Sequence, residues 1–155
     1  MVLLECLWPR QPSRGPVPTT VPADIAADYV EASLVIGYST KASAALSRRC
    51  LQHLLWDKGS KQRQLGDQLT EMKPTMPSAL QDFVDLIQLF GNLSAHPKEN
   101  KNTGEVIDVE PGEAEVMLDV LDSLFDFYYV KPARYQELLD SVKAKKEASQ
   151  DAKRQ

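Results

Sequence analysis

The segment 40–58 limits the fold more than any other part of the chain, because its apolar positions cover a wide arc of a single helix. Two apolar rows lie side by side at helical spacing: Ala42, Leu46, Cys50 and Leu54 in one, and Ala44, Leu51 and Leu55 in the other. An arc this wide is buried only when the helix contacts neighbours on several sides. The sequence therefore predicts a helical domain with this segment at its centre.

Other segments repeat apolar residues at helical spacing, and prolines, glycines or capping residues separate them. They lie at about 23–38, 62–72, 78–90, 111–128 and 135–142. Two short apolar stretches, Val2–Leu7 and Val106–Val109, have the composition of strands and are each other's simplest partners. We therefore predict an all-α bundle of five to six helices with a minor two-stranded β-ribbon.

The two ends of the chain differ in composition from the predicted bundle. Residues 1–22 begin with the predicted strand and continue as an arm that is rich in proline. Residues 143–155 have no apolar face and many charges, which predicts a solvated C-terminal tail. The helical domain is expected to span residues 23–142, and Val130–Pro132 is expected to interrupt its last helices.

Charge and hydropathy exclude some classes of protein. The net charge of −4 argues against a non-specific nucleic-acid binder, although a local basic site is compatible with it. From Glu105 to Asp126 there are eight acidic residues and no basic one. The acidic helix at 110–126 is either a solvated face or a docking surface for a protein partner. No apolar run reaches the roughly 18 residues that span a bilayer, and no secretory leader is recognised, so we expect a cytoplasmic protein without membrane contact.

Metal and cofactor motifs are lacking in the sequence. Cys50 and His53 resemble half of a metal site, but no matching pair occurs elsewhere. Cys50 is better interpreted as a core residue. We therefore expect no metal ion and no cofactor.

Two adjacent arginines lie at the edge of the predicted buried surface, where an arginine usually needs a carboxylate partner. We expect Arg48 or Arg49 to pair with Glu31 or Asp28 on the first helix. Binding of a phosphate by these arginines is the alternative interpretation.

Three segments carry a combination of motifs: Tyr29–Ala32, Ser39–Gln52 and Gly91–His96. Together with 104–107 and 111–114, they resemble domain of unknown function 4145, a family of the HEPN clan. The resemblance covers about residues 20–130, in the same order and spacing. It implies a helical bundle that is commonly dimeric, so we expect a homodimer.

Many members of the HEPN clan are metal-independent endoribonucleases, and the resemblance implies Asn92 and His96 as catalytic residues. His96 would shuttle a proton, and Asn92 would orient the phosphate or the imidazole. Members of the family often carry arginine at the position of Gln88, where this chain cannot neutralise a phosphate.

Losing the contact between a cation and the transition-state phosphate costs about 2.7–4 kcal/mol, so the sequence leaves open whether the chain is an enzyme. Four residues are candidates for binding the substrate: Arg48, Arg49, Gln88 and Lys98. We expect a degenerate or weak ribonuclease, or an RNA-binding protein, of the kind that serves in toxin–antitoxin or defence systems. The alternative is a non-catalytic dimerising scaffold that binds a protein partner.

Overall fold

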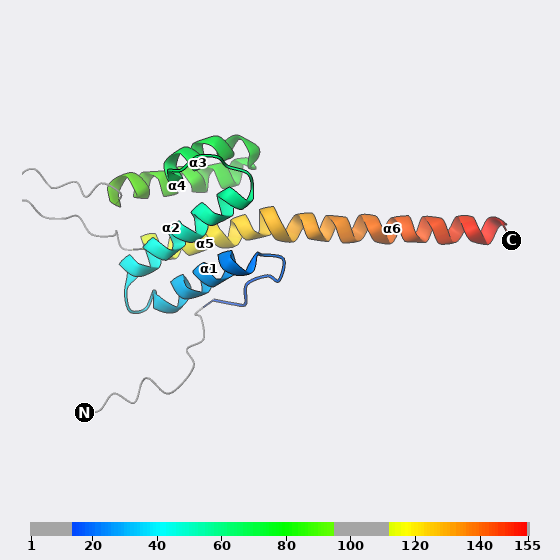
Figure 1. Ribbon diagram of the computed structural model, residues 1–155, viewed down its shortest axis with the longest axis horizontal. Helices are drawn as coiled ribbons and strands as arrows, with labels where there is room; N and C mark the ends of the chain where they lie inside the picture. Colours follow the sequence, from blue (N-terminus) through cyan, green and yellow to red (C-terminus); the bar gives the residue numbers. More distant parts are fainter. Residues whose placement is uncertain (1–13, 95–111, 155) are drawn as a thin grey trace, which may run out of the picture.

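The computed structural model describes residues 14–94 and 112–154, and helices make up most of both segments (Figure 1). In chain order the elements are α1 (Ala23–Val35), α2 (Thr40–Asp57), α3 (Leu65–Met72), the 3-10 turn η2 (Lys73–Thr75), α4 (Ser78–Ser94), α5 (Glu113–Phe125), the π-helical turn η3 (Asp126–Val130) and α6 (Lys131–Arg154). The all-α prediction is confirmed for these residues, among which no strand occurs. Both segments predicted to form the β-ribbon, Val2–Leu7 and Val106–Val109, lie outside the described residues.

Local signals in the sequence explain where several helices begin and end. The hydroxyl oxygen of Ser39 accepts a hydrogen bond from the backbone N–H of Ala42 (3.1 Å), which caps the start of α2. Gly59 follows the end of α2 with a φ of 101°, a conformation that favours glycine. The prolines at 74 and 77 separate α3 from α4.

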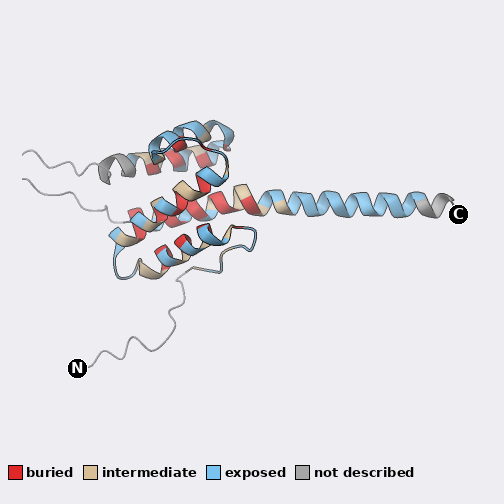
Figure 2. Ribbon diagram, viewed as in Figure 1, coloured by how far each residue is buried: buried red, intermediate tan, exposed pale blue. Residues whose placement is uncertain are grey.

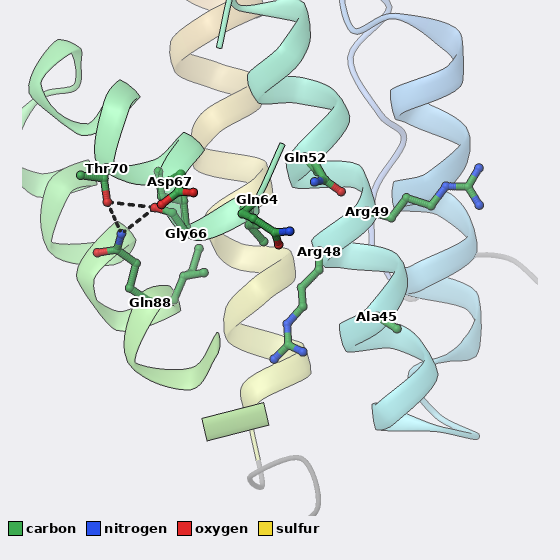
Figure 3. A pocket seen from close by; sticks show the side chains of 12 residues that line it. Ala45, Arg48, Arg49, Gln52, Gln64, Gly66, Asp67, Thr70 and Gln88 are labelled. Carbon is green, nitrogen blue, oxygen red and sulfur yellow. Dashed lines mark hydrogen bonds between the residues drawn. The ribbon is translucent and has the colours of Figure 1, made fainter. Parts of the chain in front are cut away.

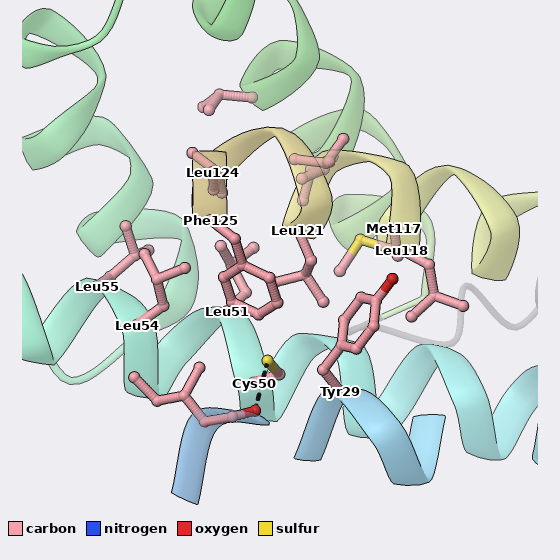
Figure 4. Close-up of a cluster of buried hydrophobic side chains, with 14 of the residues drawn as sticks. Tyr29, Cys50, Leu51, Leu54, Leu55, Met117, Leu118, Leu121, Leu124 and Phe125 are labelled. Carbon is pink, nitrogen blue, oxygen red and sulfur yellow. Dashed lines mark hydrogen bonds between the residues drawn. The ribbon is translucent and has the colours of Figure 1, made fainter. Parts of the chain in front are cut away.

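Helix α2 lies at the centre of the bundle and packs against α1, α3 and α5, while α4 packs against α3 and α5 (Figures 1 and 2). The wide apolar arc predicted for α2 is confirmed, because Leu51, Leu54 and Leu55 are completely buried. They meet the inner face of α5, where Leu121 and Leu124 are buried to the same extent (Figure 4). Burying a side chain of this size contributes about 1.5–3 kcal/mol, so the contact between α2 and α5 dominates the core.

Two tyrosines of the core donate hydrogen bonds to carboxylates on neighbouring helices. The hydroxyl of Tyr29 donates to Asp122 (2.5 Å) and joins α1 to α5, and Arg14 pairs with the same carboxylate (2.8 Å). The hydroxyl of Tyr129 donates to Asp57 (2.8 Å) and joins η3 to the end of α2. These bonds fix how the helices are placed around the apolar centre.

The core should lose stability in alkaline solution because of Cys50, whose thiol is buried and donates to the carbonyl of Ile25 (3.4 Å). Burial, reinforced by the charges of Asp28 and Asp24, raises the pKa of this thiol from 9.0 to about 12. The unfolded chain therefore releases the proton from about pH 9, while the folded chain retains it. We expect the urea midpoint to stay constant between about pH 7 and 9 and to fall between about pH 9 and 12.

Replacing Cys50 with alanine should make this alkaline fall shallower. The fall should not vanish, because burial and the hydrogen bonds to Asp122 and Asp57 also raise the pKa values of Tyr29 and Tyr129. A wild-type midpoint that stays constant up to pH 11 would contradict the expectation.

The predicted break at Val130–Pro132 is wrong. Helix α5 passes through η3 directly into α6, so residues 113–154 form one continuous rod (Figure 1). Proline lacks an N–H and its ring collides with a carbonyl one turn earlier in a regular α-helix. In the π-helical turn the N–H of Lys131 bonds to the carbonyl of Asp126, five residues earlier. This wider turn lets Pro132 follow without ending the helix.

Helix α6 leaves the bundle and projects into solvent (Figures 1 and 2). Among the described elements it contacts only η3. It continues past residue 142, the predicted end of the helical domain, and residues 143–150 are exposed on it. None of the described helices combines the length and the apolar character that crossing a bilayer requires.

Candidate functional site

A cleft of about 670 Å³ opens between α2, α3 and α4 (Figure 3). Seven polar side chains line it: Arg48, Arg49 and Gln52 of α2, Gln64 just before α3, Asp67 and Thr70 of α3 and Gln88 of α4. Three of the four predicted substrate-binding residues thus border the same cleft, although 39 positions separate Gln88 from Arg49 in the sequence.

Gln88 connects α4 to α3 on one side of the cleft. Its amide nitrogen donates hydrogen bonds to the carbonyl of Gly66 (3.3 Å) and to the hydroxyl oxygen of Thr70 (3.2 Å). The hydroxyl of Thr70 in turn donates to the carbonyl of Gly66 (2.9 Å). Gln88 therefore ties α4 to α3 and supplies no positive charge.

Arg48 pairs with Glu113, the first residue of α5. The carboxylate is buried, with 1% of its side chain exposed, and it lies at the positive end of its helix. The guanidinium of Arg48 borders the cleft and extends toward the start of α5 (Figure 3). Much of its charge therefore serves to compensate the Glu113 carboxylate.

Arg49 is held differently, at the outer edge of the cleft. Its side chain is 61% exposed and extends toward α1 (Figure 3), where Nε lies 3.4 Å from Oδ2 of the buried Asp28. Nδ1 of His53 lies 3.0 Å from the same oxygen, and the His53 ring stacks on Trp56. The pairing with Asp28 that we expected for one of the two arginines is confirmed for Arg49, but this arginine is exposed.

Further residues of α2 position the loop between α2 and α3 beside the cleft. The amide of Gln52 donates to the carbonyl of Arg63 (2.7 Å), and the indole N–H of Trp56 donates to the carbonyl of Gln62 (2.8 Å). Sequence reasoning missed Gln52 and Trp56. Their one visible signal is the spacing of four residues, which places both on the face of α2 that also carries Arg49.

The predicted catalytic residues are not placed by the described parts of the chain. Asn92 lies in the last helical turns of α4, four positions after Gln88, but its side chain is outside the description. His96 and Lys98 lie outside the described residues altogether. Their roles therefore stay predictions.

Two guanidinium groups and three amide side chains of the cleft can bind anions and hydrogen-bonding groups, whereas the carboxylate of Asp67, which also lines it, repels anions. Among residues 14–94 and 112–154 there is no group of three or more histidine, cysteine, aspartate or glutamate side chains that could hold a metal ion.

One family model matches most of this sequence. The model described as "Domain of unknown function (DUF4145)" matches residues 30–142, which is most of the chain and includes every residue that lines the cleft. The chain belongs to the DUF4145 family. No curated protein and no solved structure gives a significant match to it. The DUF4145 match extends through α2–α5 and into the first half of α6, so the projecting helix begins within the family's domain.

Proposed function

We propose that this DUF4145 protein binds single-stranded RNA in the cleft between α2, α3 and α4, as a HEPN-like domain with weak or no cleavage activity. The observation that supports the proposal is the convergence of Arg48, Arg49 and Gln88 on one cleft. Guanidinium groups form bidentate hydrogen bonds with phosphates, and amide side chains can pair with the edges of unstacked bases. A role in a toxin–antitoxin or defence system would fit such a protein.

Arg49 is the better phosphate ligand of the two arginines. Its guanidinium is largely exposed. When Arg49 leaves Asp28 to bind a phosphate, Nδ1 of His53 still lies beside the Asp28 carboxylate. Arg48 is committed to the buried Glu113, so moving it toward a ligand would uncover a buried charge.

Weak cleavage is expected because the cleft lacks an uncommitted cation on α4. Gln88 can donate a hydrogen bond to a phosphate, but it cannot neutralise the charge that develops in the transition state. Asn92 and His96 remain the proposed catalytic residues at the end of α4 and just beyond it.

Replacing Arg49 with alanine should weaken RNA binding roughly ten- to a hundredfold, because a hydrogen bond to a charged group is worth roughly 1.5–3 kcal/mol. The slope of binding against salt should also fall by about one. The free energy of unfolding should change by about 1 kcal/mol or less, because the Arg49 side chain, which pairs with Asp28, is exposed to solvent. Fluorescence anisotropy with a labelled 12-nucleotide RNA in chelator measures the binding.

Arg63→Ala is the matched control, because Arg63 lies in the same region but does not line the cleft. It should bind RNA within about twofold of the wild type. Equal losses in both variants would mean that RNA binds through general surface charge. A wild-type protein that binds no RNA at 100 µM, roughly the weak end of non-specific affinities, would refute the proposal.

A second function, a non-catalytic scaffold that dimerises and binds a protein partner, is favoured by a different observation. Helix α6 projects from the bundle with several large apolar side chains exposed to solvent. The homodimer expected from the resemblance stays a prediction. Both proposed functions, the RNA-binding domain and the scaffold, are compatible with it.

A further inference from the structure

An apolar stripe on α6 has no cover in the described chain. Tyr135, Leu138, Leu139 and Val142 follow one another at helical spacing, and each is between 54% and 62% exposed. Apolar side chains grouped on an otherwise polar surface usually mark an interaction site. A single helix free in water is also only marginally stable, and most helices in proteins owe their stability to a packed face.

The charges of α6 are sorted around this stripe. At 3.6 residues per turn, Lys131 and Lys146 extend the stripe at its two ends, and Arg134 and Lys143 flank it. The acidic residues Glu137, Asp140 and Glu147 fall on the opposite half of the helix. The occupant of the stripe should therefore combine an apolar surface with acidic neighbours.

The bundle itself carries such a surface, at the base of α6. A shallow cavity of about 510 Å³ lies between α4, α5 and η3, where Phe83 and Phe127 form apolar walls and Asp122 and Asp126 lie at the edge. Lys131 lines the cavity too and pairs with Asp126 (2.9 Å), so this carboxylate is partly compensated within the chain. A second cavity of about 510 Å³ adjoins it through Phe127 and includes Tyr128, Pro132 and Tyr135. Because Tyr135 also begins the stripe, the apolar surface is continuous from α4 to α6.

Helix α4, helix α5 and η3 strengthen this complementarity, because their sequences contain no lysine or arginine. Their acidic residues include Asp82 and Glu115, which are exposed, and Asp119, which is exposed and pairs with Arg14 (2.7 Å). The region 131–150 of the same chain has a net positive charge. One copy therefore presents both halves of a complementary pair.

We propose that the apolar stripe on α6 of one copy docks on a second copy, where it covers the base of α6 and the adjoining acidic cavity. Two chains then form a reciprocal antiparallel pair. The two-fold axis passes near Tyr135. Because the chains are antiparallel, Leu138, Leu139 and Val142 then pack against Tyr128 and Pro132 of the partner subunit. The two copies bury the same patch, as a closed two-fold dimer requires.

The charges agree with this register. Lys146 lies eleven residues beyond Tyr135, about 16 Å along the helix. In the antiparallel partner, eleven residues before the partner's Tyr135 is the partner's Leu124. Lys146 therefore lies at the height of the partner's Asp122 and the partner's Asp126. Lys143 lies opposite the partner's Phe127, next to the partner's Asp126, while Lys131 lies opposite an apolar position of the partner.

The stripe alone is too small for a specific interface. Such interfaces bury roughly 1,200–2,000 Å² in total, more than four half-exposed side chains from each copy supply. The contact must therefore extend onto the cavities that contain Phe127 and Tyr128, as this register provides. An RNA partner would use the basic side chains but would leave the apolar stripe without a function.

This inference rests on the homodimer of the proposed function, and it is independent of RNA binding. The first measurement is light scattering of the full-length protein at 50 µM, with helicity followed by circular dichroism. We expect a dimer for the wild type and a helical monomer for L138D/V142D. The loss of two leucine- or valine-sized contacts from each copy should raise the dimer Kd at least about a hundredfold. The matched control E137Q, on the opposite half of α6, should remain dimeric.

Cysteine cross-linking tests the register in a C6S background, where Cys50 is buried. Y135C should form a disulfide-linked dimer on mild oxidation, because both copies of position 135 lie at the two-fold axis. E137C should not. Reversing the charge in K146E should raise the dimer Kd about tenfold, and adding D126K in the same chain should restore part of the affinity.

Two outcomes would overturn the proposal in distinguishable ways. A wild-type monomer at 50 µM would remove the homodimer itself, and binding of that monomer to vesicles with anionic lipid would assign the stripe to a membrane surface. A wild-type dimer that L138D/V142D leaves intact would keep the homodimer but place its interface elsewhere. RNA titrations of the same variants report on the cleft separately, because none of these substitutions lines it.

Discussion

Replacing Gln88 with arginine should raise metal-independent cleavage of single-stranded RNA about a hundred- to a thousandfold. This range corresponds to the roughly 2.7–4 kcal/mol that one preorganised donor contributes to the transition state. Gln88 already borders the cleft from α4, and it lies one helical turn before Asn92. An arginine there would add a cation on the same helix as the proposed catalytic residues.

The substitution has a structural cost that the experiment must separate from the gain. Gln88 donates to Gly66 and Thr70, so Gln88→Arg loses or replaces two hydrogen bonds between α4 and α3. Gln88→Met is the matched control, because it removes the same bonds without adding charge. Cleavage of a labelled RNA in chelator, followed by gel electrophoresis, should increase only with arginine.

The dependence on His96 tests whether the gained activity uses the proposed site. His96→Ala in the Gln88→Arg background should abolish the increase, because the proton shuttle is lost. If Gln88→Arg folds normally and gains no activity, the interpretation as a degenerate nuclease loses its main support. If the wild type already cleaves RNA rapidly and His96→Ala stops it, another cation must serve the site.

Replacing Arg48 with alanine should have the largest effect on stability, a loss of about 3–5 kcal/mol. Removing one partner of a buried ion pair is strongly destabilising, because the charge that stays buried loses a strong interaction. Glu113 is almost completely buried at the start of α5, and Arg48 is its cationic partner. For a chain of this size we expect the Tm to fall by roughly 10 °C, measured by circular dichroism.

A double substitution distinguishes the charge from the packing. In Arg48→Met with Glu113→Gln, no charge is left in the pair, so this variant should recover a large part of the lost stability. Arg49→Ala serves as the comparison on the adjacent position, where the exposed side chain predicts a small effect. A loss below about 1 kcal/mol in Arg48→Ala would show that Glu113 does not depend on this partner.

Much of the fold could be predicted from local patterns. The wide apolar arc of α2, the Ser39 cap and the inner face of α5 each depend on residues within a few turns of one another. The continuity of α5 and α6 could not be predicted, because Pro132 breaks a regular helix and is accommodated only by the π-helical turn before it.

The candidate site was harder to predict than the fold. The sequence singled out Arg48, Arg49 and Gln88, but only tertiary packing places them around one cleft. Arg48 finds its partner 65 positions away, since Glu113 becomes buried only when α5 docks on α2. A local pattern in the sequence carries no information about that distance.

The continuous rod from α5 to α6 has a hydrodynamic consequence. Its 42 residues span about 60 Å, whereas a spherical chain of this length would have a radius of gyration of only about 15 Å. The projecting arm increases friction with the solvent without adding much mass. A monomer will therefore elute early in gel filtration, at the volume of a heavier globular protein. Elution volume alone would overstate the number of chains, and molar mass has to come from scattered light or sedimentation equilibrium.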